Sequence, residues 1–267
     1  MKLAKVKPNS SKIPIIAGLL LVFLPGVYEG YQYWPHYESY TAMGELVDVK
    51  QLGIQGSVQF VYLKEGVTRN RQEKKEAQKL MPDALFETTD AEALDYLQEE
   101  AEEGEAYRYE TIRNAVVSTL GQDGDEANEE SIEFKISTLD DEASMYIGDS
   151  FGLMVAIGLY EEAHNLDFSW GGRFTIAGTG TMEDDHTVGS VGGIRDKLRT
   201  AERDRAEYFF VPKDKETYMN EGMSNEEEAF LAAKELDLQL NIVPVVTLEE
   251  AITFLKDLNY MTIPKGD

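Results

Sequence analysis

Segments with strand patterns alternate with segments with helix patterns over the second half of the chain, and this alternation constrains the fold more than any other feature. Short apolar or two-residue-periodic runs predict strands, and longer apolar segments predict helices. Such alternation is typical of a layered α/β or α+β fold. The predicted strands are 131–137, 173–178, 207–212 and 239–245, and the predicted helices are 152–163, 192–203, 225–236 and 248–258.

The chain before residue 82 predicts a strand pair and a helix. Residues 44–63 read as two strands around a turn that contains Gly53 and Gly56, because alternating apolar residues flank a glycine-containing segment. Residues 68–81 predict a charged, exposed helix, and Pro82 ends it. We find no internal repeat, and we expect one domain over 40–260.

A second helix is predicted over 91–120, with Thr89 or Asp90 as its cap. We expect Gly104 to break this helix. Residues 121–130 (GQDGDEANEE) predict a polar, acidic loop. A run of acidic residues on the helix is interpreted as a solvated face rather than a metal site: Glu99, Glu100, Glu102, Glu103 and Glu105.

The N-terminus combines a basic tail with an apolar stretch. Lysines at four of the first 12 residues precede an uncharged stretch from Ile13 to Tyr28. That stretch is short for a helix that must cross about 30 Å of hydrocarbon. No small-residue pair typical of signal-peptide cleavage follows it. Instead come aromatic residues suited to a membrane interface: Tyr28, Tyr31, Tyr33, Trp34 and Tyr37.

These features predict an uncleaved transmembrane anchor over 13–30, with a cleaved signal peptide as the alternative. The lysine bias predicts that the tail 1–12 stays in the cytoplasm. The protein would then cross the cell membrane once, through an N-terminal helix, and place the 40–260 domain outside the cell.

Composition excludes several classes of function. The chain has 25 basic and 50 acidic residues and a net charge of −25, and a surface that acidic repels nucleic acid. The absence of cysteine removes thiol nucleophiles and cysteine–zinc sites. The three histidines, His36, His164 and His186, lie far apart, so we expect no metal. No P-loop motif occurs, and we expect no nucleotide or other cofactor.

Gly148, Asp149, Ser150, Phe151 and Gly152 form the first unusual segment, because glycines flank a serine just before a strongly apolar helix. The start of a buried helix offers unpaired N–H groups and a positive dipole end. Such a place holds a nucleophile and stabilises an oxyanion. The other interpretation is that Ser150 simply caps the helix.

Lys197 is the second unusual residue. In GGIRDKLRTA it falls on the same helix face as Ile194, Leu198 and Ala201. A lysine on an apolar face either extends its ammonium to solvent or is buried, and burial lowers its pKa. A lysine with a lowered pKa serves as a general base. Ser150 and Lys197 together suggest a Ser–Lys dyad.

Residues 147–211 resemble the proteolytic domain of Lon-type serine peptidases, and above all the membrane-anchored, PDZ-containing Lon-like peptidases of Gram-positive bacteria. The matching stretches are IGDSFGLMVAIGLYEE and RFTIAGTGTMEDDHTVGSVGGIRDKLRTAERDRAEYFFVP. The resemblance implies that Ser150 is the nucleophile, that Lys197 is its base, and that Thr179 supports the dyad. Backbone N–H groups near Gly148 and Ser150 would receive the oxyanion.

The chain departs from the family in three ways. Only the acidic loop 121–130 stands where a PDZ domain is expected. Asp149 replaces a proline beside the nucleophile, and its carboxylate would raise the pKa of Lys197 and oppose its role as base. Phe151 replaces a small residue, and we expect it to narrow the substrate groove.

The predicted function is therefore an extracytoplasmic, ATP-independent serine endopeptidase that cleaves peptides or flexible protein segments. The alternative is a degenerate peptidase fold that binds a partner protein at the cell surface without catalysis. The sequence leaves the oligomeric state open.

Overall fold

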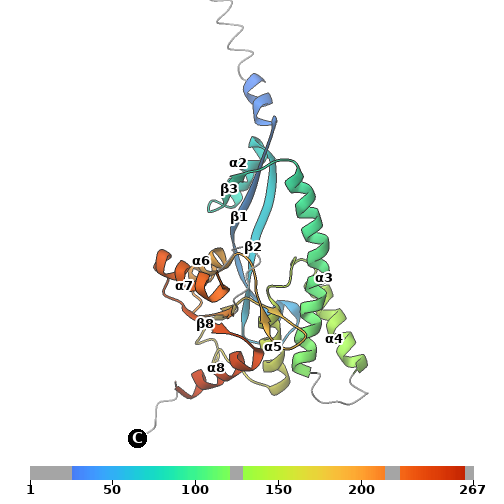
Figure 1. Cartoon of the computed structure of the whole chain (residues 1–267), viewed down its shortest axis with the longest axis vertical. Helices are drawn as coiled ribbons and strands as arrows, with labels where there is room; N and C mark the ends of the chain where they lie inside the picture. Colours follow the sequence, from blue (N-terminus) through green and yellow to red (C-terminus); the bar gives the residue numbers. More distant parts are fainter. Residues whose placement is uncertain (1–25, 121–128, 214–222, 262–267) are drawn as a thin grey trace, which may run out of the picture.

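The computed structural model describes residues 26–120, 129–213 and 223–261, and it shows a mixed α/β fold (Figure 1). The main sheet has the strand order β3-β1-β2-β4-β7-β8. Strands β2, β4, β7 and β8 run parallel, whereas β1 pairs antiparallel with β2 and with β3. The bounds are β1 Pro35–Asp48, β2 Gln59–Asn70, β3 Leu85–Thr88, β4 Ile176–Gly178, β7 Tyr208–Pro212 and β8 Asn241–Val245.

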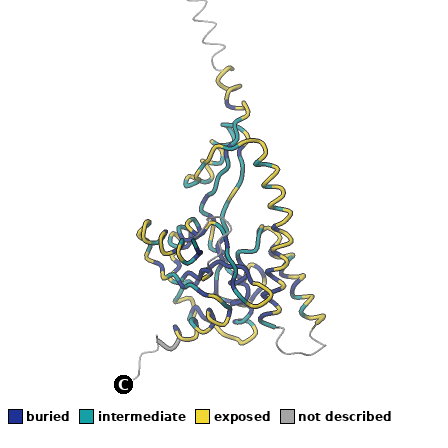
Figure 2. The backbone as a smooth tube through the Cα atoms, in the orientation of Figure 1, coloured by how far each residue is buried: buried dark blue, intermediate teal, exposed yellow. Residues whose placement is uncertain are grey.

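Helices cover both faces of this sheet. Successive strand residues point to opposite faces, so neighbouring residues of one strand pack against different helices. Phe60 and Phe210 pack with the helices α3, α4, α5 and α8, whereas Val61 and Phe209 pack with α6 and α7. The buried residues gather in this body of the molecule (Figure 2). The helices are α3 Glu92–Leu120, α4 Glu129–Glu142, α5 Gly152–His164, α6 Ile194–Arg203, α7 Asn225–Leu236 and α8 Leu248–Met261.

The long hairpin of β1 and β2 projects from the body, with α2 (Arg71–Leu80) and β3 near its far end (Figure 1). A 3-10 turn, η1 (Val49–Leu52), joins the two strands, and Gly53 ends it with a φ of 76°. The two strands predicted over 44–63 are thus confirmed, but both are longer than predicted. β2 continues to Asn70, so the helix predicted from residue 68 begins only at Arg71.

The elements of the second half match the predicted alternation closely. α5, α6, β7 and α8 begin and end within three residues of their predicted bounds. α7 begins and ends as predicted, because Ser224 accepts a hydrogen bond from the N–H of Glu227 while the Glu227 side chain accepts one from Ser224. A small second sheet, β5 (Thr181–Met182) with β6 (Val188–Gly189), was not predicted.

The strand predicted over 131–137 is wrong, because this segment belongs to helix α4. The two-residue pattern depended on Phe134, whose side chain is 74% exposed. The residues that pack into the core are instead Ile132, Ile136 and Leu139, which follow helical spacing. Residues 121–128 of the predicted loop lie outside the described residues, and the last two loop residues begin α4.

The predicted break at Gly104 is also wrong, because α3 runs without interruption over 29 residues. Gly104 is buried, and a Cβ atom there would lie 2.7 Å from Ile147 and 3.1 Å from the backbone nitrogen of Gly148. The glycine therefore allows the helix to pass close to the segment before Ser150. The acidic run from Glu99 to Glu105 lies exposed on the same helix.

Within the described parts of the chain, no helix combines the length and apolarity needed to cross a bilayer. Residues 1–25, which include the predicted basic tail and most of the predicted anchor, lie outside the described residues. Residues 26–32 are helical and, apart from Gln32, exposed.

Candidate active site

Lys197 lies on the buried face of α6, together with Ile194, Leu198 and Ala201 as the helical spacing predicted. Its side chain does not extend to solvent, since the residue is only 6% exposed. Burial lowers its pKa from 10.5 to about 8, because an ammonium loses its hydration in the protein interior. With this pKa, about a tenth of Lys197 is uncharged at pH 7, far more than for an ordinary lysine.

Thr179 connects Lys197 to the segment that carries Ser150. The Lys197 Nζ donates to Thr179 Oγ1 at 3.1 Å, and Thr179 Oγ1 donates to the backbone oxygen of Ser150 at 2.9 Å. Thr179 is fully buried directly after β4, and its N–H donates to the backbone oxygen of Phe210. The structure thus joins Lys197, through the Thr179 side chain, to the main chain of Ser150, from three separate parts of the fold.

Ser150 stands in the loop before α5 and does not cap this helix. Phe151 is the residue at the cap position, and no side-chain hydrogen bond caps the helix. Gly148 has a φ of 90°, a left-handed conformation that favours glycine. The N–H of Gly180 also donates to the Ser150 backbone oxygen, at 2.8 Å. The main chain at Ser150 is therefore fixed by two hydrogen bonds, and the residue as a whole is half-buried.

Two backbone N–H groups beside Ser150 have no partner among the described residues, those of Ser150 itself and of Phe151. They lie at the start of α5, where helix geometry leaves the first N–H groups unpaired. This position suits an oxyanion. Among the hydrogen bonds of the described residues, none joins Ser150 Oγ directly to Lys197 Nζ.

Helix α3 packs closely against the loop that carries Ser150 at two glycines, Gly104 and Gly152. A Cβ atom at Gly152 would lie 2.0 Å from Thr111 Oγ1 and 2.8 Å from the backbone nitrogen of Met182. In the space that this glycine leaves, Thr111 Oγ1 accepts from the Met182 N–H at 2.8 Å, and Asn114 donates to the Met182 oxygen at 2.9 Å. With the contact at Gly104, these interactions fix the loop, β5 and α3 relative to one another.

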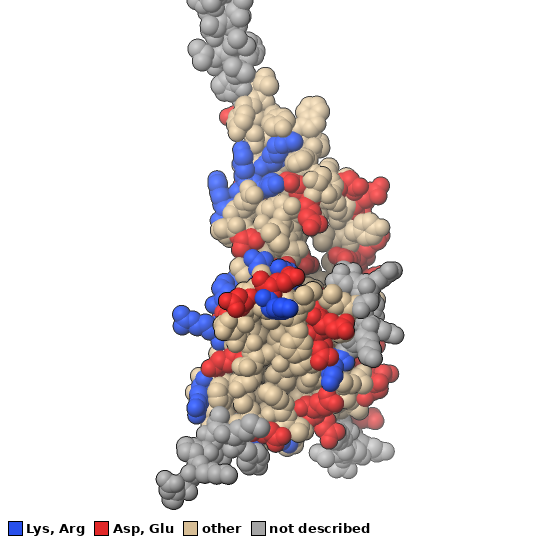
Figure 3. Space-filling model, turned by 60° about the vertical axis from the view of Figure 1, so that its left-hand side comes forward, with Lys and Arg blue, Asp and Glu red and all other residues tan. Residues whose placement is uncertain are grey.

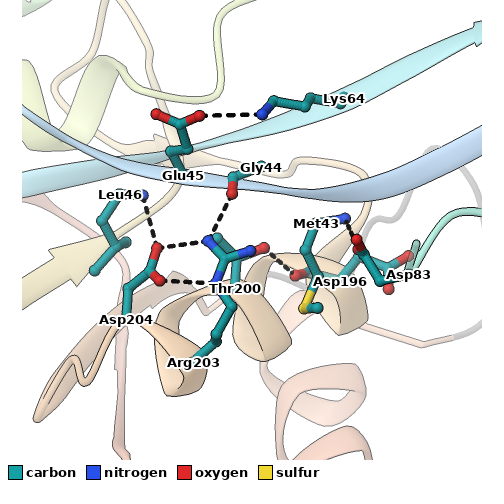
Figure 4. A network of polar contacts seen from close by, with 10 residues as sticks. All are labelled: Met43, Gly44, Glu45, Leu46, Lys64, Asp83, Asp196, Thr200, Arg203 and Asp204. Carbon is teal, nitrogen blue, oxygen red and sulfur yellow. Dashed lines mark hydrogen bonds and ion pairs between the residues drawn. The ribbon is translucent and has the colours of Figure 1, made fainter. Parts of the chain in front are cut away.

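The C-terminal end of α6 is tied to the β1–β2 hairpin by hydrogen bonds (Figure 4), and these contacts fix the helix that carries Lys197. Arg203 donates to the backbone oxygen of Gly44 at 2.6 Å, and Asp204 accepts from the Leu46 N–H at 3.3 Å. Gly44 lies where the register of β1 and β2 shifts, and a side chain there would collide with the backbone oxygen of Tyr62. The irregularity in β1 thus turns a carbonyl toward α6.

Carboxylates surround Lys197. The charges of Asp149, Glu65 and Glu228 each raise its pKa, in that order of strength, but burial outweighs all three. Burial also raises the pKa of Asp149, while the charge of Lys197 lowers it. No ion pair joins Asp149 to Lys197 among those of the described residues, so this attraction acts at longer range.

Asp149 and Phe151, the two residues next to Ser150 at which the sequence departs from the Lon-like pattern, have different surroundings. Asp149 has the electrostatic effect on Lys197 that the sequence predicted. Phe151, in contrast, is 3% exposed and packs in the core with its ring 5.3 Å from that of Phe60. The expectation that Phe151 narrows a substrate groove is therefore wrong.

The sequence did not predict that Glu65 or Glu228 would lie near Lys197. Glu65 lies in β2 and Glu228 in the first turn of α7, where acidic residues are common for reasons of helix stability. Glu65 also lines a cavity of about 320 Å³ between the hairpin and α3, with Tyr40, Tyr96 and Glu100. Only the folded structure brings Glu65 and Glu228 near Lys197.

No protein-family model matches this chain, and no curated protein matches it either. The resemblance to Lon-type peptidases therefore stays a prediction, and the geometry of the site is what supports a function.

Proposed function

We propose that the protein is a serine endopeptidase in which Ser150 is the nucleophile and Lys197 the general base. The observation that carries this proposal is a buried lysine, with its pKa lowered to about 8, that is joined through Thr179 to the backbone of Ser150. A lysine buried only for packing would not need a threonine that ties it to a serine loop at a helix start.

In the proposed reaction, neutral Lys197 removes the proton from Ser150 Oγ as this oxygen bonds to the carbonyl carbon of a peptide. The carbonyl oxygen becomes an anion, and the N–H groups of Ser150 and Phe151 stabilise it. When the C–N bond breaks, Lys197 gives the proton to the leaving amine. Lys197 then removes a proton from water as the water oxygen bonds to the acyl carbon, and it returns this proton to Ser150 Oγ as the ester bond breaks. No nucleotide enters these steps, so flexible segments are the proposed targets.

The cavity at Glu65 is the proposed approach for a peptide, because the charge of Glu65 reaches Lys197. Membrane anchorage through residues 13–30, with the domain outside the cell, is part of the same proposal. It is supported by the basic and apolar pattern of the N-terminal sequence.

Labelling with a fluorophosphonate probe and cleavage of a quenched flexible peptide test this function. Ser150→Ala is expected to abolish both labelling and cleavage. Lys197→Ala is expected to reduce both by at least 100-fold, since general-base catalysis contributes about 10²–10⁴. The matched controls are Ser144→Ala and Lys234→Ala, which change exposed residues and are expected to keep full activity.

Loss of activity in only one of the two variants would contradict a dyad. Absence of labelling and cleavage in the wild-type protein between pH 6 and 10 would favour the non-catalytic binding module instead.

A further inference from the structure

One end of the molecule presents a run of exposed aromatic side chains. Tyr28, Tyr31, Tyr33 and Trp34, which we call the aromatic tip, are each more than half exposed. They lie on the helical residues 26–32 and the turn that leads into β1. Single exposed aromatic residues are common, but a continuous group marks an interaction surface. Aromatic rings of this kind prefer the headgroup level of a bilayer.

Basic residues gather next to the aromatic tip. The segment Arg69–Leu80 has five basic and two acidic residues in a chain whose net charge is −25. We call Arg69, Arg71, Lys75 and Lys79 the basic collar. Figure 3 shows Lys and Arg side chains gathered directly beneath a mostly uncharged, tan region that borders the undescribed N-terminal residues. Such a local reversal of charge, in so acidic a protein, indicates an anionic partner.

The collar and the tip are in contact, so both meet the same partner. The guanidinium of Arg71 lies 4.3 Å from the ring centre of Tyr31. Lys75 Nζ lies 5.5 Å from the ring centre of Tyr28 and donates to Gln32 Oε1 at 2.7 Å. A cation beside an exposed tyrosine ring forms a surface that is apolar and positive at once, as the interface of an anionic bilayer requires.

Helix α2 has the character of a surface helix, because none of its residues is buried. Lys75 and Lys79 are exposed, and Leu80 at its end is 82% exposed. The other large basic side chain of the helix, Lys74, is already paired with Glu38 at 2.7 Å, and we leave it out of the collar for that reason.

We propose that the aromatic tip and the basic collar dock on the headgroups of a bilayer that contains anionic lipid. This inference extends the proposed membrane location, since the apolar stretch of Ile13–Tyr28 leads directly into the tip. The lipid surface, rather than an acidic protein, is favoured by this continuity and by the grouping of rings and cations at one end.

Docking of this end has a consequence for the candidate active site. β2 runs from Gln59, which pairs with Ala177 beside Thr179, to Asn70 at the collar. At about 3.3 Å per residue, the hairpin holds Thr179 about 35 Å from the bilayer surface. The acidic body is repelled by the anionic lipid that attracts the collar, so the long axis of the molecule points away from the membrane.

Lysine footprinting of the full chain tests the proposal. The chain is reconstituted in nanodiscs of zwitterionic lipid alone or with about one-third phosphatidylglycerol, and acetylation by a neutral N-hydroxysuccinimide ester is followed by mass spectrometry. Lys75 and Lys79 are expected to react about five-fold more slowly on the anionic discs, in line with the free energy of one basic residue at such a surface. Exposed Lys234 on α7 is the internal control, and 0.5 M salt is expected to remove the difference.

Equal acetylation rates at Lys75 and Lys79 on both kinds of disc would overturn the proposal. If residues 13–30 do not span the membrane, the experiment gives a different result. The chain would then bind only to vesicles with anionic lipid and would be released in 0.5 M salt. That result would support docking by the basic collar without a transmembrane helix. The double variant Lys75→Glu, Lys79→Glu is expected to lose that binding, and unchanged binding would again overturn the proposal.

Discussion

Replacement of Lys197 by methionine is expected to stabilise the folded protein at neutral pH and to destabilise it slightly at high pH. Methionine has a similar length and no charge. In the wild-type protein, folding at pH 7 requires an ammonium to be buried, and the low pKa of about 8 measures that penalty with the attraction of the nearby carboxylates already included.

The magnitude follows from linkage. The gap between the ordinary pKa of 10.5 and about 8, at about 1.4 kcal/mol per pKa unit, corresponds to about 3 kcal/mol. Between these two pH values the unfolded chain binds more protons than the folded one, so wild-type stability rises with pH in this window. The penalty is complete below pH 8 and absent above pH 10.5. Loss of the hydrogen bond to Thr179 acts in the other direction, by about 1 kcal/mol.

Lys197→Met is therefore expected to raise the free energy of unfolding by about 2 kcal/mol at pH 7, to leave it nearly unchanged at pH 10, and to lower it by about 1 kcal/mol at pH 11. Urea unfolding of both proteins at pH 7, 8, 9, 10 and 11 measures this crossing. The control is Lys234→Met, an exposed lysine on α7, whose effect on stability should not depend on pH. A Lys197→Met protein that is less stable than wild type by the same amount at every pH would refute the account of a buried, destabilised ammonium.

Three further predictions concern the neighbours of Lys197, the proposed base. Asp149→Asn removes the strongest of the charges that raise the pKa of Lys197, so the alkaline rise of the pH–rate profile should move to lower pH. With a pKa of about 8, only about a tenth of Lys197 is neutral at pH 7, so the rate at pH 7 can rise by at most about ten-fold. Identical pH–rate profiles of the wild-type and Asp149→Asn proteins would contradict this prediction. Arg203→Ala removes the hydrogen bond to Gly44. It should lower the melting temperature by about 2–4 °C and change kcat more than KM. The control is Arg195→Ala, which removes an exposed ion pair with Glu235 on α6 and should change neither the melting temperature nor kcat. Glu100→Gln should raise KM for a lysine-containing peptide by about two- to five-fold at low salt and leave a neutral peptide unchanged, because Glu100 lines the cavity beside Glu65; equal changes in KM for both peptides would show that substrate does not bind in this cavity.

Local patterns were sufficient where a segment's own residues decide its structure. The capping pair Ser224 and Glu227 marks the start of α7 in the sequence as clearly as in the fold. Lys197 could be assigned to a buried face because Ile194, Leu198 and Ala201 share that face at helical spacing. In α4, however, the exposed Phe134 fits both a strand and a helix pattern, and only packing shows that it faces solvent.

Long-range contacts account for what the sequence could not predict. Gly104 resembles a helix breaker in isolation, and its actual role depends on Gly148, 44 residues later in the chain. Glu65 and Glu228 reach Lys197 from β2 and α7, with no local signal that they would do so. The pKa of Lys197 depends on their placement, so its value could not be derived from the spacing of Ser150 and Lys197.

In the proposed peptidase, the surroundings of Lys197 would make its pKa depend on the charge of the substrate. Asp149, Glu65 and Glu228 keep the lysine protonated to higher pH than burial alone would allow, and Glu65 also faces the cavity that a peptide would enter. A cationic side chain bound there would offset the charge of Glu65 and repel the ammonium, so neutral Lys197 becomes easier to form once substrate is bound. The inflection in kcat, which reports the enzyme–substrate complex, is then expected below that in kcat/KM for a lysine-containing peptide. For a neutral peptide of equal length the two inflections should coincide. A cationic peptide that separates them no further than a neutral one would show that Glu65 does not sense the substrate.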